Sequence, residues 1–385
     1  MKKHSSILSQ MLQMIPRYEF QKAVKRHNAE RHSKGFSSWA QFVALLFCQI
    51  AGHDGLRGVV AGLAAYTSRL YHLGVSRIRR STLSYANCHR SHTVFQEVFL
   101  TLLAKVHSHA PGHKFRFKNP LYSFDATTVD LALGLYDWAK FRKTKGGIKI
   151  HVKLNHNGYI PEFITVTNAK RHEVKEVDSF QLRAGDVVVF DRGYTDFARF
   201  AKYCDEGIYF ITRLKKNAVY RVVERRNVSK HKNISSDQVI ELRGYYTKKK
   251  CPVRLRRIRV KDPETKKYIE LLTNQLDWSP ATIGAVYKDR WQIEIFFKTI
   301  KQNLKVKSFL GTSKNAILSQ IWVAMIAYLL LSYMKFLSSY QWTINSLAKI
   351  LPTLLFSCRN LWDWLNEPFG EPPPAFYNTG QLELI

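Results

Sequence analysis

The sequence predicts a mixed α/β protein with an N-terminal helical domain and a β-rich insertion within its core. Three observations support this prediction. Apolar residues recur at helical spacing near the N-terminus, strand-like segments follow one another from Leu121, and a basic β-like stretch separates these strands from a late helix. The 385 residues suffice for two or three domains with substantial cores.

The first block, residues 1–118, is predicted to be helical. Apolar side chains recur at helical spacing within residues 36–51, and a second helical stretch is expected at 56–73. With a turn at Gly74 and a basic segment at 79–90, the second stretch resembles a helix-turn-helix that could read bases in the major groove. Plain helical packing with a basic rim explains the same pattern equally well.

The middle of the chain reads as strands. Residues 159–166 follow a strand across Asn157–Gly158, a pair typical of hairpin turns, and 186–190 form a short apolar run typical of a strand buried on both faces. The strands are expected at 121–133, 148–154, 159–166, 186–190 and 208–214, with a helix at 196–205. This order indicates a mixed α/β sheet.

The rest of the chain is predicted as an insertion followed by helices. Strand-like pieces occur at 218–223, 238–242, 253–260 and 268–273. Helices are expected at 286–309, 317–336 and 343–365, before a Pro-rich tail. The predicted domains are 1–118, 119–212, 213–284, 285–340 and 341–385.

Charge indicates a polyanionic partner. Lys and Arg number 60 against 29 Asp and Glu, which gives a net charge of +31 and a pI near 10.0. Residues 1–118 hold 18 basic and 4 acidic residues and 213–261 hold 17 and 3, so these two blocks carry 28 of the 31 excess charges (14 plus 14). Ten of the 14 histidines lie in the first block, and most are expected to be surface residues or phosphate contacts rather than metal ligands.

Cysteine and hydropathy patterns favour a cytoplasmic protein. The five cysteines are scattered and form no CxxC pair, so neither a disulfide framework nor a zinc site is indicated. The N-terminus does not resemble a signal peptide. Residues 317–334 form an uncharged segment whose length is at the lower limit for a membrane span. The polar residues Ser319, Gln320 and Ser332 interrupt it. We therefore expect a buried core helix.

A set of polar residues recurs along the predicted helix 286–309. Its spacing is Tyr-x2-Arg-x3-Glu-x6-Lys, formed by Tyr287, Arg290, Glu294 and Lys301. At about 100° per residue these four side chains share one narrow face, with Trp291, Lys298 and Lys305 beside it. A carboxylate flanked by Arg, Lys and Tyr suits a metal ligand next to phosphate anchors, although a solvated face with ion pairs gives the same pattern.

Two further acids lie at or near strand ends, where residues of neighbouring strands can meet. These are Asp125 and Asp191, and Glu294 could approach them from a covering helix. Phosphodiester chemistry by two divalent cations needs such converging carboxylates. Composition alone cannot select these three among 29 acids, and Asp130 and Asp137 are rivals for Asp125.

Three segments that contain these acids resemble the acidic motifs of the insertion sequence 4 family of DDE transposases. They are FDATTVDL, VVFDRGYTDF and YKDRWQIEIFFKTIKQNLKVKSF. The Tyr-Arg-Glu-Lys signature is intact at the family's spacing. The segment RRSTLSYANCHR is similar to the N-terminal domain of one branch of that family, so the resemblance covers nearly the whole chain.

The resemblance implies a ribonuclease-H-like core interrupted by the β-rich insertion. It implies cut-and-paste transposition with end nicking, a hairpin on the transposon end, hairpin resolution and strand transfer. Asp125, Asp191 and Glu294 would hold two Mg²⁺ ions, with Mn²⁺ as a substitute. Tyr287, Arg290 and Lys301 would contact the terminal phosphates. The implied partners are transposon-end and target DNA, with a dimer in the synaptic complex, in the nucleoid of a bacterial cytoplasm.

Other residues are weaker candidates for DNA contacts. Trp291 could stack on an extruded base, and Lys298 and Arg192 lie next to the motif acids. Arg79, Arg80 and Arg90 are candidates for recognising the element end. Lys248, Lys249 and Lys250 are candidates for gripping phosphates near the active site.

Two rival functions remain. A sequence-specific DNA-binding protein that has lost its nuclease predicts a broken acidic set, and the set here is whole. A ribonuclease-H-fold nuclease or junction resolvase without strand transfer has no need to hold a hairpinned end, and the Tyr-Arg-Glu-Lys set argues against it.

Overall fold

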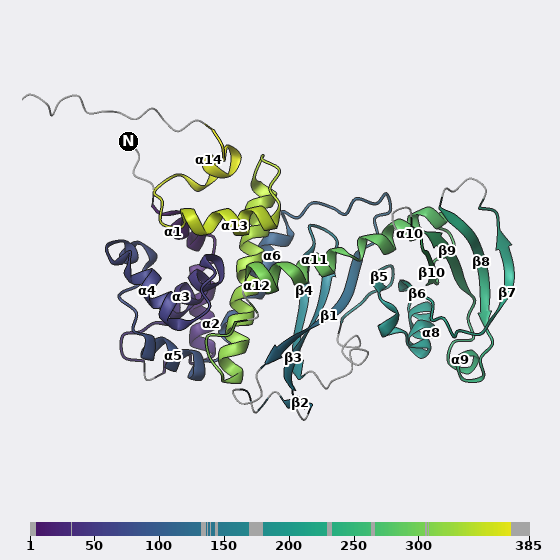
Figure 1. Cartoon of the computed structure of the whole chain (residues 1–385), viewed down its shortest axis with the longest axis horizontal. Coiled ribbons are helices and arrows are strands. Elements are labelled where there is room, and N and C mark those ends of the chain that lie inside the picture. Colours follow the sequence, from purple (N-terminus) through teal and green to yellow (C-terminus); the bar gives the residue numbers. More distant parts are fainter. Residues whose placement is uncertain are drawn as a thin grey trace, which may run out of the picture.

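A ten-stranded sheet runs through the computed structural model and determines where the helices lie (Figure 1). Its strands are β1 (Leu121–Leu131), β2 (Lys140–Arg142), β3 (Lys145–Asn155), β4 (Ile160–Asn168), β5 (Val187–Phe190), β6 (Tyr209–Arg213), β7 (Tyr220–Arg226), β8 (Ile234–Leu242), β9 (Leu255–Lys261) and β10 (Tyr268–Thr273). The structure describes residues 5–31, 33–131, 136, 138, 140–142, 145–168, 180–228, 233–262, 266–304, 306 and 308–370. Asp137, Lys305 and the end of the predicted Pro-rich tail lie outside the described residues.

The half of the sheet next to the helical block has the order β4-β3-β1-β5-β6. β3 runs antiparallel to both β1 and β4, and the predicted Asn157–Gly158 hairpin is confirmed, with Gly158 at a φ of +67°. β5 and β6 follow parallel to β1, joined by helix α8 (Phe197–Asp205), because parallel neighbours need a crossover. This is the ribonuclease-H-like arrangement, and the predicted fold class is confirmed.

The basic insertion extends the same sheet. β10 pairs antiparallel with β6, and β9, β8 and β7 follow outward. At its centre Arg256 and Asp237 form a buried bidentate pair, with Nε–Oδ1 at 2.8 Å and Nη2–Oδ2 at 2.6 Å. Arg256 Nη1 also donates to the carbonyl of Trp278 at 2.6 Å. This contact ties the insertion to the segment that leads into helix α10 (Pro280–Asp289).

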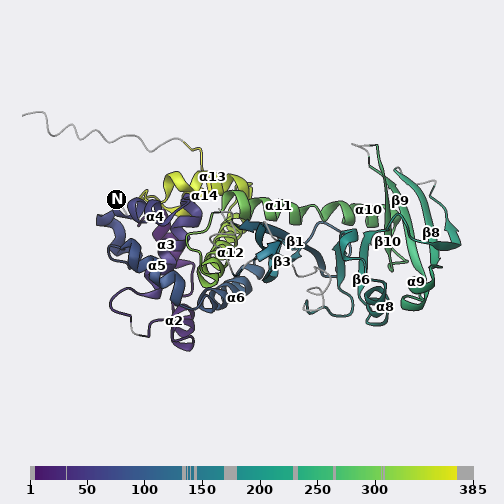
Figure 2. The same cartoon turned by 60° about the horizontal axis from the view of Figure 1, so that its bottom comes forward.

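Helices cover the two faces of the sheet separately (Figure 2). On one face α8 packs with the unpredicted short helix α9 (Tyr245–Lys250) over a core that includes Phe200 and Phe210. On the other face α10 packs on β6, β8 and β9 through Ile283 and Val286. Anything on α9 is therefore separated from α10 by the thickness of the sheet.

Helices from both ends of the chain form one block beside the sheet (Figure 1). They are α1 (Ile7–Gln13), α2 (Arg17–Arg26), α3 (Ser38–Ala51), α4 (Leu56–Ala64), α5 (Arg80–His89), α6 (Thr93–His107), α12 (Lys314–Leu337), α13 (Ile344–Leu354) and α14 (Leu361–Asn366). The predicted helical stretch at 56–73 consists of α4 and a 3-10 helix, Thr67–Leu73, and at the junction the Thr67 hydroxyl donates to the Ala64 carbonyl at 2.6 Å. The predicted helix at 343–365 is interrupted where the Leu355 carbonyl accepts from the Leu8 N–H at 2.9 Å.

Helix α12 lies at the centre of this block. It packs against α6 and α3 on one side and β4 on the other. By length and composition it could cross a membrane, but 94% of its apolar window is buried inside the molecule, as expected for a core helix. Its polar Gln320 accepts from the Leu310 N–H at 2.9 Å and donates to the Ser308 carbonyl at 2.7 Å, so it fixes the loop that follows the predicted catalytic helix.

The packing of α12 predicts a large stability cost for truncating its core side chains. Leu329 is fully buried, so Leu329→Ala should lower the free energy of unfolding by about 2–5 kcal/mol. Leu337, at the end of the same helix, is 40% exposed, and Leu337→Ala should cost less than about 1 kcal/mol. Urea unfolding followed by circular dichroism measures both. Equal losses would show that α12 is not the centre of the core.

Candidate active site

Asp125 and Asp191 lie side by side because their strands pair in parallel. The pairing of β1 with β5 runs from Leu121–Val187 to Phe124–Phe190. Asp125 is the next residue of β1, and Asp191 directly follows the end of β5. Neighbouring strands are about 5 Å apart, so the two carboxyl groups share one edge. Asp125 Oδ1 accepts from the Ala126 N–H at 2.8 Å, and Asp191 Oδ1 accepts from the Gly193 N–H at 2.7 Å.

Arg290 joins the third predicted acid to the first. Its Nη2 donates to Glu294 Oε1 at 2.7 Å, and its Nη1 lies 3.7 Å from Asp125 Oδ2. Burial opposes the charge of this guanidinium, but the hydrogen bond to Glu294 and the charges of Tyr287 and Asp125 outweigh burial and raise the pKa of Arg290. The guanidinium therefore stays charged between two carboxylates.

The predicted single helix at 286–309 is wrong, because it is broken twice. α10 ends at Asp289, and α11 (Gln292–Lys298) begins after a tight junction in which the Trp291 N–H bonds to the Lys288 carbonyl, three residues back. A π-helical turn, Thr299–Asn303, then widens the helix, with the Leu304 N–H bonded to the Thr299 carbonyl. Such turns appear frequently at functional sites.

Tyr287 lies near two arginines, Arg290 and Arg213, of which the sequence indicated only Arg290. Its ring has the Arg290 guanidinium at 5.8 Å and that of Arg213, at the end of β6, at 5.5 Å. Its hydroxyl is buried with no hydrogen-bond partner among the described residues. Burial raises the pKa of Tyr287, and the two arginines offset part of the rise. Arg213 was missed because its own segment does not show that the parallel pairing of β5 with β6 brings the end of β6 beside Asp191, whose carbonyl accepts from the Thr212 hydroxyl at 3.2 Å.

The other residues of α11 and its extension divide between the sheet and the solvent. The Lys301 ammonium donates to the Thr128 carbonyl of β1 at 2.7 Å, three residues beyond Asp125. Trp291 is 59% exposed at the helix junction, and Lys298 is also exposed. The structure thus brings Tyr287 next to Arg290, and Lys301 onto the strand that carries Asp125, about 10 Å along β1 from that acid.

The donor set suits a hard divalent cation, although the three acids do not converge. Carboxylate oxygens are the ligands that Mg²⁺ prefers, and Asp125 and Asp191 supply them from one edge. In the described part of the chain no three His, Cys, Asp or Glu side chains form a metal-binding group. Glu294 is paired with Arg290 instead, so this guanidinium provides the positive charge beside the acids.

A buried polar network lies directly beneath the site. The Asp289 carboxylate accepts from Lys114 Nζ at 2.5 Å, His156 Nδ1 at 2.7 Å and the Tyr159 hydroxyl at 3.2 Å. His156 Nε2 lies 2.7 Å from the hydroxyl of Ser123, two residues before Asp125. Asp289 directly precedes Arg290, and Ser123 lies on the strand of Asp125. The network therefore connects the helix that leads to Arg290 with the strand that carries Asp125.

The order Ser123–His156–Asp289 resembles a nucleophile triad, but its burial excludes that role. The three residues are 0%, 1% and 4% exposed, so no substrate reaches the hydroxyl. Burial lowers the pKa of His156 despite its contact with Asp289, which keeps the ring neutral. Burial would raise the pKa of Asp289, but the hydrogen bonds from His156 and Lys114 outweigh it and hold the pKa low. A neutral ring donating from Nδ1 and accepting from Ser123 satisfies the whole network.

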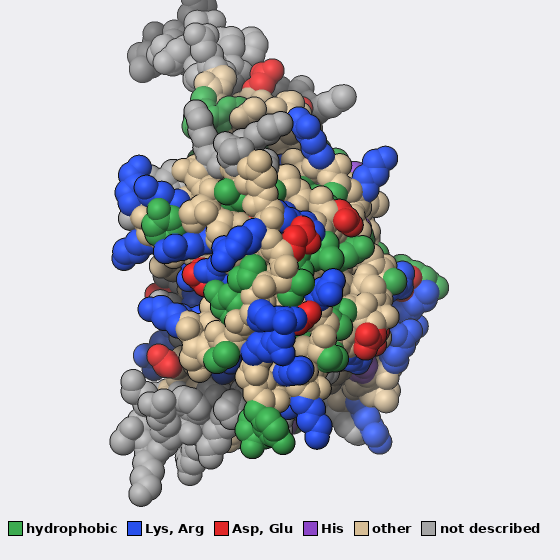
Figure 3. All heavy atoms as spheres, turned by 90° about the vertical axis from the view of Figure 1, so that its right-hand side faces the viewer, with side chains coloured by type: hydrophobic (Ala, Val, Ile, Leu, Met, Phe, Trp, Pro, Cys, Tyr) green, Lys and Arg blue, Asp and Glu red, His purple; other side chains and the backbone are tan. Residues whose placement is uncertain are grey.

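Of the remaining candidates for DNA contacts, Arg192 lies next to Asp191 and the others lie apart from the acids. Arg192 is exposed in the turn after Asp191. Arg79 and Arg80 are exposed at the start of α5, while Arg90 ends that helix about 15 Å away. Lys248, Lys249 and Lys250 are exposed on α9, across the sheet from α10, at the end of the molecule where Lys and Arg side chains gather (Figure 3). Asp130 is exposed on β1, away from the pairing with β5.

Comparisons with known proteins agree with this geometry. Residues 116–330 match the family model described as "Transposase DDE domain", and residues 3–76 match a domain of unknown function, DUF4372. A putative transposase, y4zB, of Sinorhizobium fredii is 30% identical over 76% of this chain and 80% of its own length. The probable transposase for IS5377 of Geobacillus stearothermophilus is 26% identical over 68% of each chain.

A third relative is also a putative transposase of an insertion sequence. The putative transposase for IS4SA of Synechocystis is 25% identical over 74% of this chain and 81% of its own length. The family model spans more than half of the chain and includes Asp125, Asp191 and Glu294. Enzymes of this family cleave DNA and transfer its strands with divalent metal ions. With the ribonuclease-H-like core and the paired acids described above, these matches show that the chain belongs to the DDE transposase family.

Proposed function

We propose that the protein catalyses cut-and-paste transposition of an insertion sequence, with Asp125, Asp191 and Glu294 as its metal ligands. The observation that carries this proposal is the β1–β5 register, which sets two carboxylates side by side, with Arg290 between Asp125 and Glu294. Two Mg²⁺ ions, or Mn²⁺, held by these acids would polarise the scissile phosphate and activate the attacking oxygen.

The proposed reaction has four phosphoryl transfers. Water cleaves one strand at the end of the element and releases a 3′-hydroxyl. This hydroxyl attacks the phosphodiester of the opposite strand, which forms a hairpin and releases the flanking DNA with its own 3′-hydroxyl. A second water reopens the hairpin, and the freed 3′-hydroxyl attacks a phosphodiester of target DNA, joins to its phosphate and releases a target 3′-hydroxyl. Arg290 lies between Asp125 and Glu294, with Tyr287 next to it and Lys301 farther along β1, and we infer that these three residues hold the phosphates of a tightly bent end.

The outlying basic residues are assigned to DNA binding. We propose that the N-terminal block, with Arg79, Arg80 and Arg90, prefers the element end. Lys248–Lys250 would grip phosphates on the face of the sheet opposite α10, and Trp291, Lys298 and Arg192 would contact DNA at the site. Two copies would act together in the synaptic complex, on the nucleoid of a bacterial cytoplasm.

A nuclease of the same fold without strand transfer is the second candidate. It would share the acids but gains nothing from residues that hold a bent end. The position of Tyr287 next to Arg290, and of Lys301 on the strand that carries Asp125, favours the transposase. Detection of a hairpinned end and of joined target DNA separates the two candidates.

Changing the acids should abolish cleavage while binding persists. Asp125→Asn, Asp191→Asn and Glu294→Gln each remove a proposed metal ligand, so Mg²⁺-dependent nicking should fall by at least about a hundred-fold, with end binding nearly unchanged. Asp130→Asn, an exposed acid on the same strand as Asp125, is the matched control and should nick at the wild-type rate. Wild-type nicking by any of the three variants would remove that residue from the ligand set.

Changing Tyr287 or Lys301 should affect the later steps. Tyr287→Phe and Lys301→Ala leave all three acids in place, so the first nick should stay within about three-fold of wild type while hairpin products fall by roughly ten-fold or more. Gel analysis of labelled ends over time measures both steps. Lys202→Ala, exposed on α8 and given no role in DNA binding, serves as the control. If nicking and hairpin formation fall equally, the two residues are general phosphate contacts.

The network around Asp289 should affect both stability and rate. Asp289→Asn weakens the contacts to His156 and Lys114, so it should lower the free energy of unfolding by about 3 kcal/mol and slow nicking as Arg290 loses its fixed position. Lys114→Met removes only the partly exposed partner, whose side chain is 62% exposed, and should cost less than about 1 kcal/mol. Nicking measured well below the unfolding temperature separates the two effects. A wild-type rate for Asp289→Asn would limit the network to stability.

A further inference from the structure

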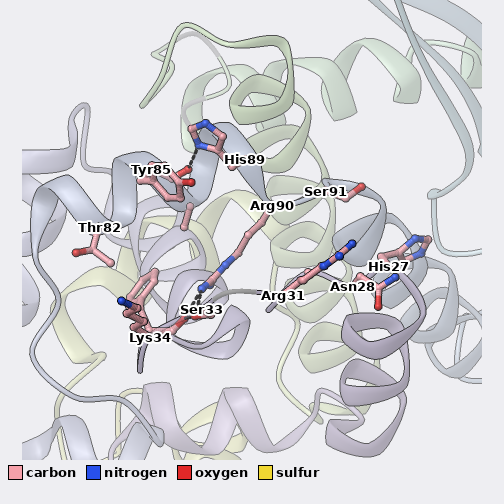
Figure 4. Close-up of a pocket in the computed structure, with 13 residues that line it drawn as sticks. His27, Asn28, Arg31, Ser33, Lys34, Thr82, Tyr85, His89, Arg90 and Ser91 are labelled. Carbon is pink, nitrogen blue, oxygen red and sulfur yellow. Dashed lines mark hydrogen bonds between the residues drawn. The ribbon is translucent and has the colours of Figure 1, made fainter.

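The helical block contains a cavity of about 470 Å³ that lies apart from the acids (Figure 4). The segment that follows α2 forms one wall, and α5 with the start of the next loop forms the other. The volume is within the range of sites that bind small molecules. A DNA duplex is too wide to enter it, but a single nucleotide is not.

The described lining of the cavity is basic. It includes Arg31, Lys34, His27, His89 and Arg90 and no Asp or Glu. Two acids lie next to this lining and are paired: Glu97 accepts from Arg26 and from the lining residue His27 at 3.1 Å, and Glu30 accepts from the Ser38 N–H. Arg31 and Lys34 are exposed at the rim, where they attract a phosphate.

Arg90 is fixed in the wall of the cavity. Its Nη2 donates to Ser33 Oγ at 2.8 Å and to the Phe36 carbonyl, and its guanidinium lies 5.2 Å from the centre of the Phe36 ring. Its own carbonyl accepts from Asn315 Nδ2 of α12 at 2.6 Å. Nη1 is buried with no hydrogen-bond partner among the described residues, so one donor beside the cavity is unused. The wall is therefore preorganised.

An aromatic pair completes the cavity. The rings of Tyr85 and His89, one helical turn apart on α5, are stacked with centroids 4.0 Å apart and planes at 20°. His89 Nδ1 donates to the Tyr85 carbonyl at 2.9 Å, which fixes the ring, and Tyr85 is 66% exposed. Unpaired bases stack on such exposed aromatic faces in proteins that bind single strands.

We propose that this cavity binds one unpaired nucleotide of a DNA strand, with its phosphate at Arg31 and Lys34 and its base on the Tyr85–His89 pair. The proposal rests on the proposed function, because cutting and bending a DNA end produces unpaired nucleotides. A free nucleotide shares the same chemistry. The exposed cations at the rim favour a strand, whose neighbouring phosphates they can also contact.

Binding of two DNAs tests the proposal. One is a duplex of the element end, and the other is the same duplex with a short single-stranded gap. Tyr85→Ala should weaken binding of the gapped DNA roughly ten-fold and leave the duplex unchanged. Tyr71→Ala is the matched control, since Tyr71 is 69% exposed and its ring lies 3.7 Å from that of His72, outside the cavity. It should change neither affinity.

Charge and competition supply the remaining readouts. Lys34→Ala should lower the salt dependence of gapped-DNA binding by about one phosphate contact, whereas Lys25→Ala, exposed on α2, should not. Equal losses for both DNAs, or none for Tyr85→Ala, would overturn the proposal and leave the proposed function standing. Deoxynucleoside monophosphate that binds as tightly as gapped DNA would overturn the assignment to a strand. Wild-type protein that binds neither DNA would overturn both proposals.

Discussion

The buried carboxylate of Asp289 is the interaction on which the site's geometry depends. It receives hydrogen bonds from the β3–β4 hairpin through His156 and Tyr159 and from the segment before β1 through Lys114. His156 passes the connection to Ser123, on the strand that carries Asp125. Removing a charge from water is costly unless such partners compensate it, so this position of α10 is strongly preferred over any shifted one.

The broken helix follows from this anchor. A regular helix through residues 286–309 would rotate its side chains by a constant angle. Here Asp289 is fixed below the site and Arg290 must reach Asp125 and Glu294 above it, which the tight junction at Arg290–Trp291 permits. The π-helical turn then brings Lys301 back onto β1. The tight junction and the π-helical turn therefore allow this segment to direct Asp289 to the buried network and Arg290 and Lys301 to β1.

Sequence patterns predicted the strands and the hairpin, because these depend on local alternation and turn residues. The acids were selected only by resemblance, and the parallel register of β1 and β5 shows why the motif residues are neighbours. The network was missed because nothing local marks His156 or Ser123 as buried partners. The continuous helix was wrong because periodicity assumes an unbroken hydrogen-bond pattern. The insertion joins the core sheet because β10 pairs with β6. The pattern of one segment does not show which distant strand it pairs with, so this pairing could not be predicted.

The shared core around α12 has a consequence for how such proteins can be recombined. The N-terminal helices and the ribonuclease-H-like sheet both pack on this one helix, which begins 196 residues after the N-terminal block ends (314 minus 118). An exchange at the apparent boundary near residue 118 would therefore separate the helices from half of their own interior. The N-terminal helices can be exchanged only together with α12. New DNA specificities therefore arise more readily by changes on the surface of the block than by replacement of the block.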